Sequence, residues 1–237
     1  MQQGAAAMAP LLPQLPELPQ WLNDSIAMRP RERTTLVQSV LAPHVQTYVE
    51  WGSGGSTELV AWLMLSGFTP TEFRAFSIES SVEWMARMRD RSNGIRAAEK
   101  GGRLRFLHGD IGATGHLGYP LRFDPARQPA RALPYVDLRK HRREVGSIDL
   151  ALVDGRFRLA CLLELLTCLT PRSGRVLLHD FAPDERGLRA RSAQYGRALE
   201  FYRVIARDNT LVTLQPRTFV NSSLREIAAS DALREAI

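Results

Sequence analysis

Residues 47–57 read Thr47-Tyr48-Val49-Glu50-Trp51-Gly52-Ser53-Gly54-Gly55-Ser56-Thr57. This run is typical of a short apolar strand that ends in an acid, then a glycine turn, then the start of a helix. Glycine has no Cβ and tolerates positive φ, so such a turn lets the backbone come very near a ligand. Ser56 or Thr57 can cap the helix. The run predicts a nucleotide-like cofactor over the turn, although similar turns also close ordinary strand–helix units.

A second buried strand, Arg74 to Glu79, also ends in an acid. It is followed by a helix predicted over Val82 to Arg91, which we expect to end at Asn93-Gly94 with a left-handed cap. An acid about 20 residues past the glycine turn of a doubly wound sheet is positioned to bind ribose hydroxyls. We therefore assign ribose binding to Glu79; the alternative is a polar residue that simply ends a strand.

Strand and helix patterns continue to alternate along the chain. Three more strands are predicted over residues 103–110, 147–155 and 174–180, and a helix over residues 158–169. This alternation implies a parallel sheet, whose ligands bind outside the carboxyl ends of the strands. Because an acid stands at the end of each of the five strands, we expect one crevice to be lined by Glu50, Glu79, Asp110, Asp154 and Asp180.

The C-terminal part predicts a β-hairpin. Residues 201–207 and 210–215 read as two strands joined by the tight polar turn Asp208-Asn209, which adds an antiparallel pair to the parallel sheet. The predicted fold is therefore a single α/β domain over residues 21–237. It has a Rossmann-like, doubly wound sheet of about seven strands, mostly parallel with an antiparallel C-terminal hairpin. Residues 1–20 are predicted to form a flexible Pro-rich tail, because prolines recur at every third position: Pro10, Pro13, Pro16 and Pro19.

The order of these motifs resembles the class I S-adenosylmethionine-dependent methyltransferase superfamily over roughly residues 30–217. The motifs are Glu50-x-Gly52-x-Gly54-Gly55, Glu79, Gly109-Asp110, Val153-Asp154-Gly155 and His179-Asp180. Residues 153–158, Val-Asp-Gly-Arg-Phe-Arg, also resemble one methyltransferase-like branch. Ser56 replaces the third glycine of the first motif, as in small-molecule O-methyltransferases. The resemblance implies that S-adenosylmethionine is the cofactor and that it is bound by Glu50, Gly52, Ser53, Gly54, Gly55, Ser56, Thr57, Glu79, Asp110, Ile111 and Asp154.

The resemblance also gives candidates for catalysis. Asp154 and Asp180 are similar in arrangement to the metal-binding acids of catechol-type O-methyltransferases, in which a divalent cation lowers the pKa of the acceptor hydroxyl. Those enzymes follow the second acid with an asparagine, whereas Phe181 stands here. A magnesium site at Asp154 and Asp180 is thus one hypothesis. The other is a protein base, His179 or Asp154. The catalytic candidates are Asp154, His179 and Asp180, acting on a small molecule with oxygen as the favoured methyl acceptor.

Two other functions stay open at this point. A nicotinamide-type dinucleotide enzyme shares the glycine turn, but it usually lacks both an acid at the position of Glu50 and the C-terminal hairpin. A non-catalytic binding or interaction protein of the same fold is the second alternative, because fold does not establish function. The long connection of residues 111–146 is where an acceptor lid would lie, with His116, Tyr119 and Tyr135 as candidate contacts. For Arg142 and Arg143 we favour a solvated helix face.

Composition limits the partners. The chain has 237 residues with 44% hydrophobic content, enough for one full α/β core. Its net charge of +6 comes almost entirely from arginines interspersed with acids, and no aromatic–basic platform indicates nucleic-acid binding. No apolar run approaches the roughly 18 residues of a membrane span, and no secretion signal is evident. We expect a cytoplasmic protein, with organelle import and oligomeric state left open.

Overall fold

The computed structural model describes residues 15–124, 128–181 and 198–217, and these contain a seven-stranded sheet. The strand order is β3-β2-β1-β4-β5-β7-β6. Strands β1 to β5 pair in parallel, β7 pairs antiparallel with β5, and β6 antiparallel with β7. The predicted fold class is confirmed. The strands are β1 (Thr47–Trp51), β2 (Arg74–Glu79), β3 (Leu104–His108), β4 (Leu150–Val153), β5 (Arg175–Leu178), β6 (Tyr202–Asp208) and β7 (Leu211–Pro216).

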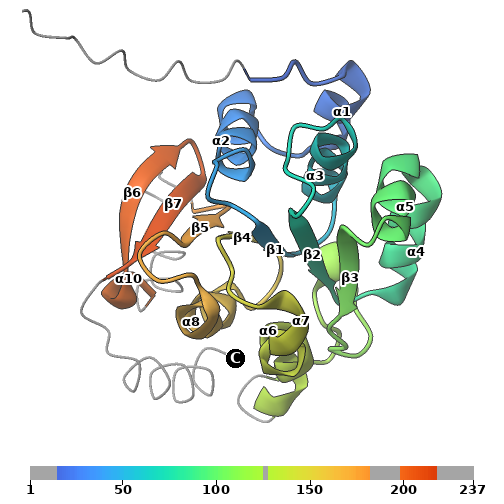
Figure 1. Cartoon of the computed structure of the whole chain (residues 1–237). Coiled ribbons are helices and arrows are strands. Elements are labelled where there is room, and N and C mark those ends of the chain that lie inside the picture. Colours follow the sequence, from blue (N-terminus) through green and yellow to red (C-terminus); the bar gives the residue numbers. More distant parts are fainter. Residues whose placement is uncertain (1–14, 125–127, 182–197, 218–237) are drawn as a thin grey trace, which may run out of the picture.

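Helices cover both faces of the sheet, as Figure 1 shows. One layer consists of α1 (Gln20–Ser25), α2 (Pro30–Val40), α3 (Gly55–Leu65), α4 (Val82–Arg91) and α5 (Asn93–Lys100). The other consists of α6 (Leu133–Val136), α7 (Arg142–Val145), α8 (Arg158–Cys168) and α10 (Ala198–Phe201). The connection between β3 and β4 also holds three short 3-10 helices: η1 (His116–Gly118), η2 (Pro129–Ala132) and η3 (Arg139–His141).

Each helical layer packs on its own hydrophobic core. Successive strand residues point to opposite faces of a sheet. Accordingly Val49 and Trp51 contribute to the core under α6 and α8, whereas Tyr48 contributes to the core under α1 to α5. Strand β1 is therefore buried on both faces, which is typical of the central strand of a parallel sheet.

The structure has α4 at the predicted bounds, Val82 to Arg91, but the left-handed cap predicted at Asn93-Gly94 is wrong. Ser92 ends α4, and the chain at once begins α5 at Asn93. The Ser92 hydroxyl oxygen accepts a hydrogen bond from the Ile95 amide at 3.3 Å, which caps the new helix. Gly94 is helical and does not have positive φ. The reason is packing, because Ile95 and Ala98 of α5 are buried in the core.

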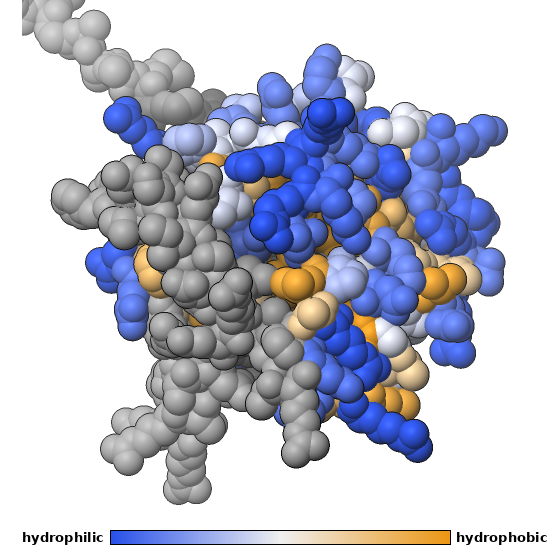
Figure 2. Space-filling view, turned by 90° about the horizontal axis from the view of Figure 1, so that it is seen from below, coloured by the Kyte–Doolittle hydropathy of each residue, from blue (hydrophilic) through white to orange (hydrophobic). Residues whose placement is uncertain are grey.

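The surface that carries α6 and α7 is largely hydrophilic. Figure 2 shows this face from below, with small apolar areas between polar side chains. Arg142 and Arg143 are exposed on α7, in agreement with the predicted solvated helix face. Within the described ranges, no helix is both long and apolar enough to cross a membrane.

Candidate functional site

The carboxyl ends of the parallel strands meet at one edge of the sheet. Trp51 of β1 pairs with Ile78 of β2 on one side and with Val153 of β4 on the other. The strand order reverses at β1, because β2 and β3 lie on one side of it and β4 and β5 on the other. Ligands of open α/β sheets bind at such a switch point. The residues that follow β1, β2, β4 and β5 therefore meet at this edge, but Glu50, one of the five acids expected to line a crevice there, is buried.

Glu50 is buried beneath this edge, with 0% of its surface exposed. Its carboxylate accepts hydrogen bonds from the hydroxyls of Tyr48 and Ser56, both at 2.9 Å, from Ser77 at 2.8 Å and from Thr57. Burial raises the pKa of Glu50, against the effect of these four donors. Glu50 thus ties β1, β2 and the start of α3 together. Its carboxylate is therefore shielded from direct contact with a cofactor.

The three glycines of the turn differ in what a side chain at each position would contact. Gly52 has a φ of +93°, and a Cβ there would come within 2.9 Å of the Gly155 Cα. A Cβ on Gly55 would lie 2.5 Å from the carbonyl oxygen of Ser25, at the end of α1. Gly54 is the exception, because a Cβ there would meet nothing within 4 Å. Gly52 and Gly55 are needed for backbone packing, and Gly54 alone borders open space.

Glu79 connects the turn to the start of α4. Its Oε2 accepts from the Ser53 amide at 3.2 Å and from the Ser53 hydroxyl at 2.8 Å. Its Oε1 accepts from the amides of Ser80 at 2.7 Å and Ser81 at 2.9 Å. The Trp84 indole N–H in turn donates to the Ser53 carbonyl oxygen at 2.9 Å. The carboxylate predicted to bind ribose therefore lies directly beside the glycine turn, held by backbone donors.

Asp110 and Ile111 are placed differently from one another. Asp110 is exposed, and its Oδ1 accepts from the Gly112 amide at 2.8 Å. The Ile111 side chain is 1% exposed and belongs to the core, while its carbonyl oxygen accepts from the Arg131 Nε–H at 2.6 Å. Of this pair, only Asp110 presents its side chain to solvent.

Tyr135, one of the predicted substrate contacts in the connection between β3 and β4, is buried in the core. Tyr135 is 2% exposed, and burial raises its pKa well above the ordinary value. Its hydroxyl oxygen accepts from the Arg156 amide at 3.3 Å. A Cβ on Gly155 would lie 1.9 Å from that oxygen, so the ring fills the space beneath the end of β4. Tyr119 is 57% exposed instead, with the Arg156 guanidinium 4.1 Å from its ring centre.

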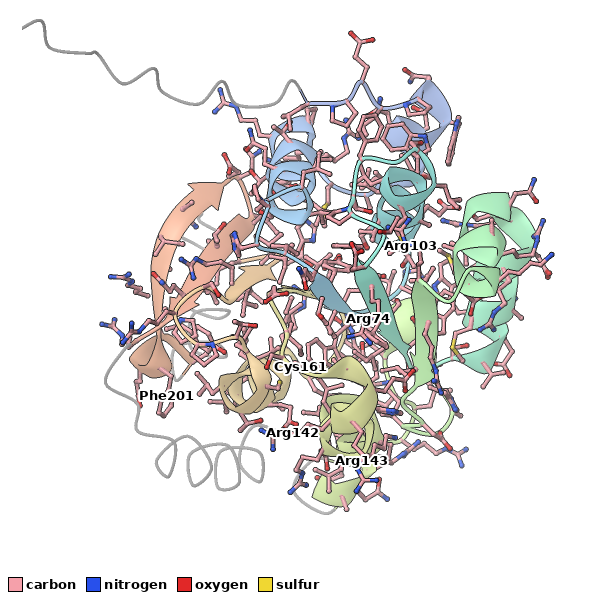
Figure 3. The ribbon with its side chains drawn as sticks, viewed as in Figure 1. Arg74, Arg103, Arg142, Arg143, Cys161 and Phe201 are labelled. Atoms are coloured by element: carbon pink, nitrogen blue, oxygen red, sulfur yellow. The ribbon has the colours of Figure 1, made fainter. Side chains whose placement is uncertain are left out.

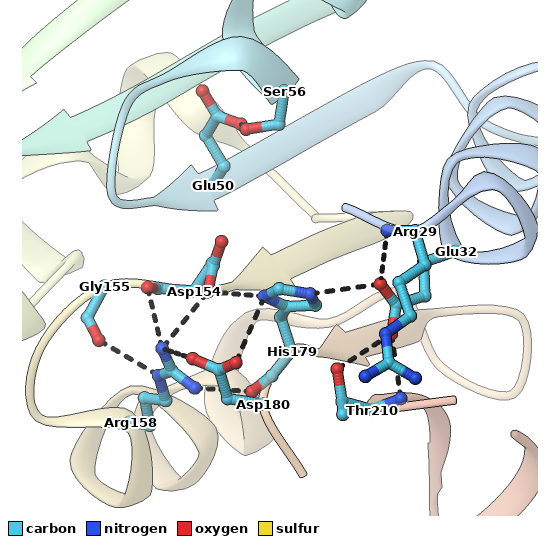
Figure 4. A network of polar contacts seen from close by, with 10 residues as sticks. All are labelled: Arg29, Glu32, Glu50, Ser56, Asp154, Gly155, Arg158, His179, Asp180 and Thr210. Atoms are coloured by element: carbon cyan, nitrogen blue, oxygen red, sulfur yellow. Dashed lines mark hydrogen bonds and ion pairs between the residues drawn. The ribbon is translucent and has the colours of Figure 1, made fainter. Parts of the chain in front are cut away.

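The catalytic candidates Asp154, His179 and Asp180 lie together at the ends of β4 and β5 (Figure 4). His179 Nδ1 lies 3.0 Å from Asp154 Oδ1 and 3.9 Å from Asp180 Oδ1. His179 Nε2 faces Glu32 Oε2 at 3.5 Å. Burial lowers the pKa of His179, but the hydrogen bond to Asp154 and the charges of Asp154, Asp180 and Glu32 outweigh it and raise that pKa.

Two members of this cluster were not found from the sequence. Arg158, the first residue of α8, donates through Nη2 to Asp154 Oδ1 at 3.1 Å and to Asp180 Oδ2 at 3.0 Å. Glu32 of α2 reaches His179 from the N-terminal part of the chain. Arg158 stands four residues after Asp154, but Asp154 precedes α8, so the pairing rule for side chains of one helix gives no signal. No local pattern pointed to either contact.

The residues present do not fit a divalent metal ion. One donor atom from each of Asp154, His179 and Asp180 lies within 4.8 Å of the others, a separation suited to a cation. However, the Arg158 guanidinium lies between the two carboxylates. Phe181 adds no side-chain oxygen, whereas hard cations require about six oxygen ligands. The predicted magnesium site at Asp154 and Asp180 is not supported.

Comparisons with known proteins agree on the fold. No protein-family model matches the chain, and a search of curated proteins found no match. A solved methyltransferase-like protein from Silicibacter pomeroyi is similar with a TM-score of 0.61 and 22% identity, covering 86% of this chain and 95% of that one. A putative O-methyltransferase from Klebsiella pneumoniae gives a TM-score of 0.50 and 12% identity, covering 82% and 84%. The chain therefore has a methyltransferase-like Rossmann fold.

Proposed function

We propose that this chain is an S-adenosylmethionine-dependent methyltransferase that methylates a hydroxyl oxygen of a small molecule. The observation that carries the proposal is the open space at Gly54 beside the Glu79 carboxylate, at the switch point of the sheet. A missing Cβ lets a ligand approach the backbone closely, and a carboxylate next to it can accept bonds from a ribose diol. The fold likeness to a putative O-methyltransferase supports the same reading.

The chain offers the following binding groups. The cofactor supplies the methyl group when bound, and the turn from Gly52 to Thr57 would hold its methionine end. Glu79 would accept the ribose hydroxyls, with the Ser53 hydroxyl giving up its present bond to Oε2. Asp110, exposed after β3, would face the adenine side, as the family resemblance implies. Asp154 completes the set from the other side of β1.

Asp154 is the candidate base for the acceptor. Its Oδ1 is engaged by His179 and Arg158, and no described residue donates to its Oδ2. That second oxygen points away from both partners in Figure 4. Methyl transfer is an in-line displacement, so the protein must mainly align the acceptor and receive its proton. In this scheme Oδ2 takes the hydroxyl proton, while His179 and Asp180 fix the carboxylate and its charge environment.

A small molecule fits the charge distribution better than a nucleic acid. Three of the four arginines labelled in Figure 3 donate to backbone carbonyl oxygens of the protein. Arg103 donates to the Met64 carbonyl oxygen at 3.0 Å, Arg74 to that of Glu144 at 3.1 Å, and Arg142 to that of Thr167 at 2.8 Å. Phosphate recognition would favour a stripe of uncommitted cations on one face.

Calorimetric titration with S-adenosylhomocysteine tests the proposal. Gly54→Val should weaken binding by at least about tenfold, which is about 1.4 kcal/mol, because its side chain would fill space that the protein leaves open beside Glu79. Glu79→Ala should do the same through lost bonds to a charged acceptor, worth about 1.5 to 3 kcal/mol each. Gly94→Ala on α5 is the control, since a Cβ there would have ordinary contacts at 3.7 Å with the Leu65 side chain and the Ser92 hydroxyl.

Three results would contradict the proposal. Wild-type protein that is folded and binds NAD but not S-adenosylhomocysteine would be a dinucleotide enzyme. A folded protein that binds neither would favour the non-catalytic interaction protein. Equal affinities for wild type, Gly54→Val and Glu79→Ala would place the cofactor elsewhere on the molecule.

A further inference from the structure

We propose that Arg158 is a built-in cation that takes the place of a divalent metal ion between Asp154 and Asp180. The proposal deepens the proposed function and rests on it for the chemical role of the cluster. It makes the acceptor site independent of metal. The chain itself then supplies the positive charge that a bound metal ion supplies in catechol-type enzymes.

The guanidinium is fixed from all sides. Besides the two carboxylates, its Nη2 lies 3.0 Å from the Asp154 carbonyl oxygen, and its Nε donates to the Gly155 carbonyl oxygen at 3.1 Å. Its Nη1 donates to the His179 carbonyl oxygen. The residue is only 7% exposed. Three backbone oxygens from the ends of β4 and β5 thus hold the cation where the two strand-end carboxylates converge, as Figure 4 shows.

Electrostatics explains why the cation belongs there. Asp154, Asp180 and Glu32 place three carboxylates around His179, so the cluster needs positive charge. Guanidinium does not lose its proton in proteins, so this charge is permanent. A metal ion entering the same space would meet the positively charged guanidinium at close range and would be repelled by it. Removal of the guanidinium should leave two carboxylates and an imidazole that together can hold a divalent cation.

The arrangement also limits how Arg158 acts on an acceptor. Each of its three nitrogens already donates to protein oxygens, so it holds Asp154 in place and supplies charge without chelating the substrate. Arg158 is therefore a positioning residue. A vicinal diol, which a metal ion would bind through both oxygens, gains no such advantage here. The site should accept a single hydroxyl directed at Asp154 Oδ2.

Manganese binding provides the test, measured by the loss of the free Mn²⁺ electron paramagnetic resonance signal and by calorimetry. Wild-type protein should not bind Mn²⁺ at this cluster. Arg158→Met, which keeps the length of the side chain but removes its charge, should bind one Mn²⁺ ion. Adding Asp180→Asn to that variant should weaken binding by at least about tenfold, as loss of a ligand does. Arg158→Lys keeps the charge and should exclude the ion as wild type does.

The outcomes separate this proposal from the proposed function. Wild-type binding of Mn²⁺ that Asp180→Asn abolishes would overturn it, and this comparison needs no Arg158 variant to fold. A folded Arg158→Met protein, judged by circular dichroism, that binds no more Mn²⁺ than wild type would overturn it too. Neither measurement uses S-adenosylmethionine. A failure to bind S-adenosylhomocysteine would therefore reject the methyltransferase proposal and leave the metal-replacement result intact.

Discussion

Glu32 joins the N-terminal part of the chain to the candidate site through a single buried carboxylate. Its Oε1 accepts from the Thr210 amide at 2.8 Å and from the Thr210 hydroxyl at 2.7 Å, and its Oε2 accepts from the Arg29 amide at 2.7 Å. Burial opposes its ionisation, but these donors and the charge of His179 hold the pKa of Glu32 below its ordinary value of 4.5. The residue is 1% exposed, so its bonds are shielded from water.

Glu32→Gln should therefore lower the free energy of unfolding at pH 7 by about 2 kcal/mol, the scale of hydrogen bonds to a charged group. Because the pKa of Glu32 is lower in the folded than in the unfolded protein, the ionised carboxylate stabilises the fold at pH values above the unfolded-state pKa. This stabilisation is lost as the pH falls through the folded-state pKa. The difference from wild type should shrink below about pH 4.5. Urea unfolding from about pH 2.5 to pH 7, which spans the folded and the unfolded pKa, measures it. Glu72→Gln, at an exposed site, should stay within about 0.5 kcal/mol. A pH-independent difference would contradict the assigned charge.

At the scale of elements, Ser92 separates α4 from α5, where the sequence predicts only the end of a helix. Its φ of −124° and ψ of 106° break α4, while its hydroxyl caps α5. The break lets α5 turn and bury Ile95 and Ala98 against α3 and the sheet. Asparagine and glycine are common just after helix ends, and serine, asparagine and glycine are common at helix starts. The residue types at Ser92-Asn93-Gly94 therefore fit either a helix end or a helix start.

Ser92→Ala should cost about 1 kcal/mol of stability, because the first turn of α5 loses the acceptor for one of its orphan amides. Ser92→Gly should cost only a few tenths of a kcal/mol, since glycine is a tolerated N-cap. Chemical denaturation of both variants gives the comparison. Equal losses would show that the hydroxyl does not act as a cap. In that case the burial of Ser92 would explain the effect.

At the scale of the whole molecule, the two ends of the described chain are connected. Thr35 of α2 donates to Asp208 Oδ2 of β6 at 2.6 Å, and Glu32 binds Thr210 beside β7. Leu22 of α1 is 0% exposed, and Leu18 packs partly buried on the same core. The segment from Leu18 to α2 is thus an integral layer of the domain. The sequence-based boundary at residue 20 remains a prediction, since residues 1–14 lie outside the described part.

Deletion of residues 1–14 should leave the melting temperature unchanged within about two degrees, because their composition lacks the apolar periodicity of a core segment. Deletion of residues 1–25 removes Leu22 and should lower the melting temperature by at least about five degrees, from a loss of about 2 to 5 kcal/mol. Differential scanning calorimetry of both truncations is the measurement. A large drop for the shorter deletion would mean that the tail packs on the domain.

The sequence by itself determined the sheet, its alternation with helices and the presence of acids at the ends of the strands. Those features follow from local periodicity and from glycines at fixed spacing, and both can be recognised within short segments of the sequence. Only the tertiary structure decided which groups those acids contact. Glu50 proved to be buried among four hydroxyls, Tyr135 to belong to the core, and Arg158 to lie between Asp154 and Asp180. The contact of Glu32 with His179 joins residues 32 and 179. Such contacts depend on how distant elements pack, and no local pattern encodes that packing.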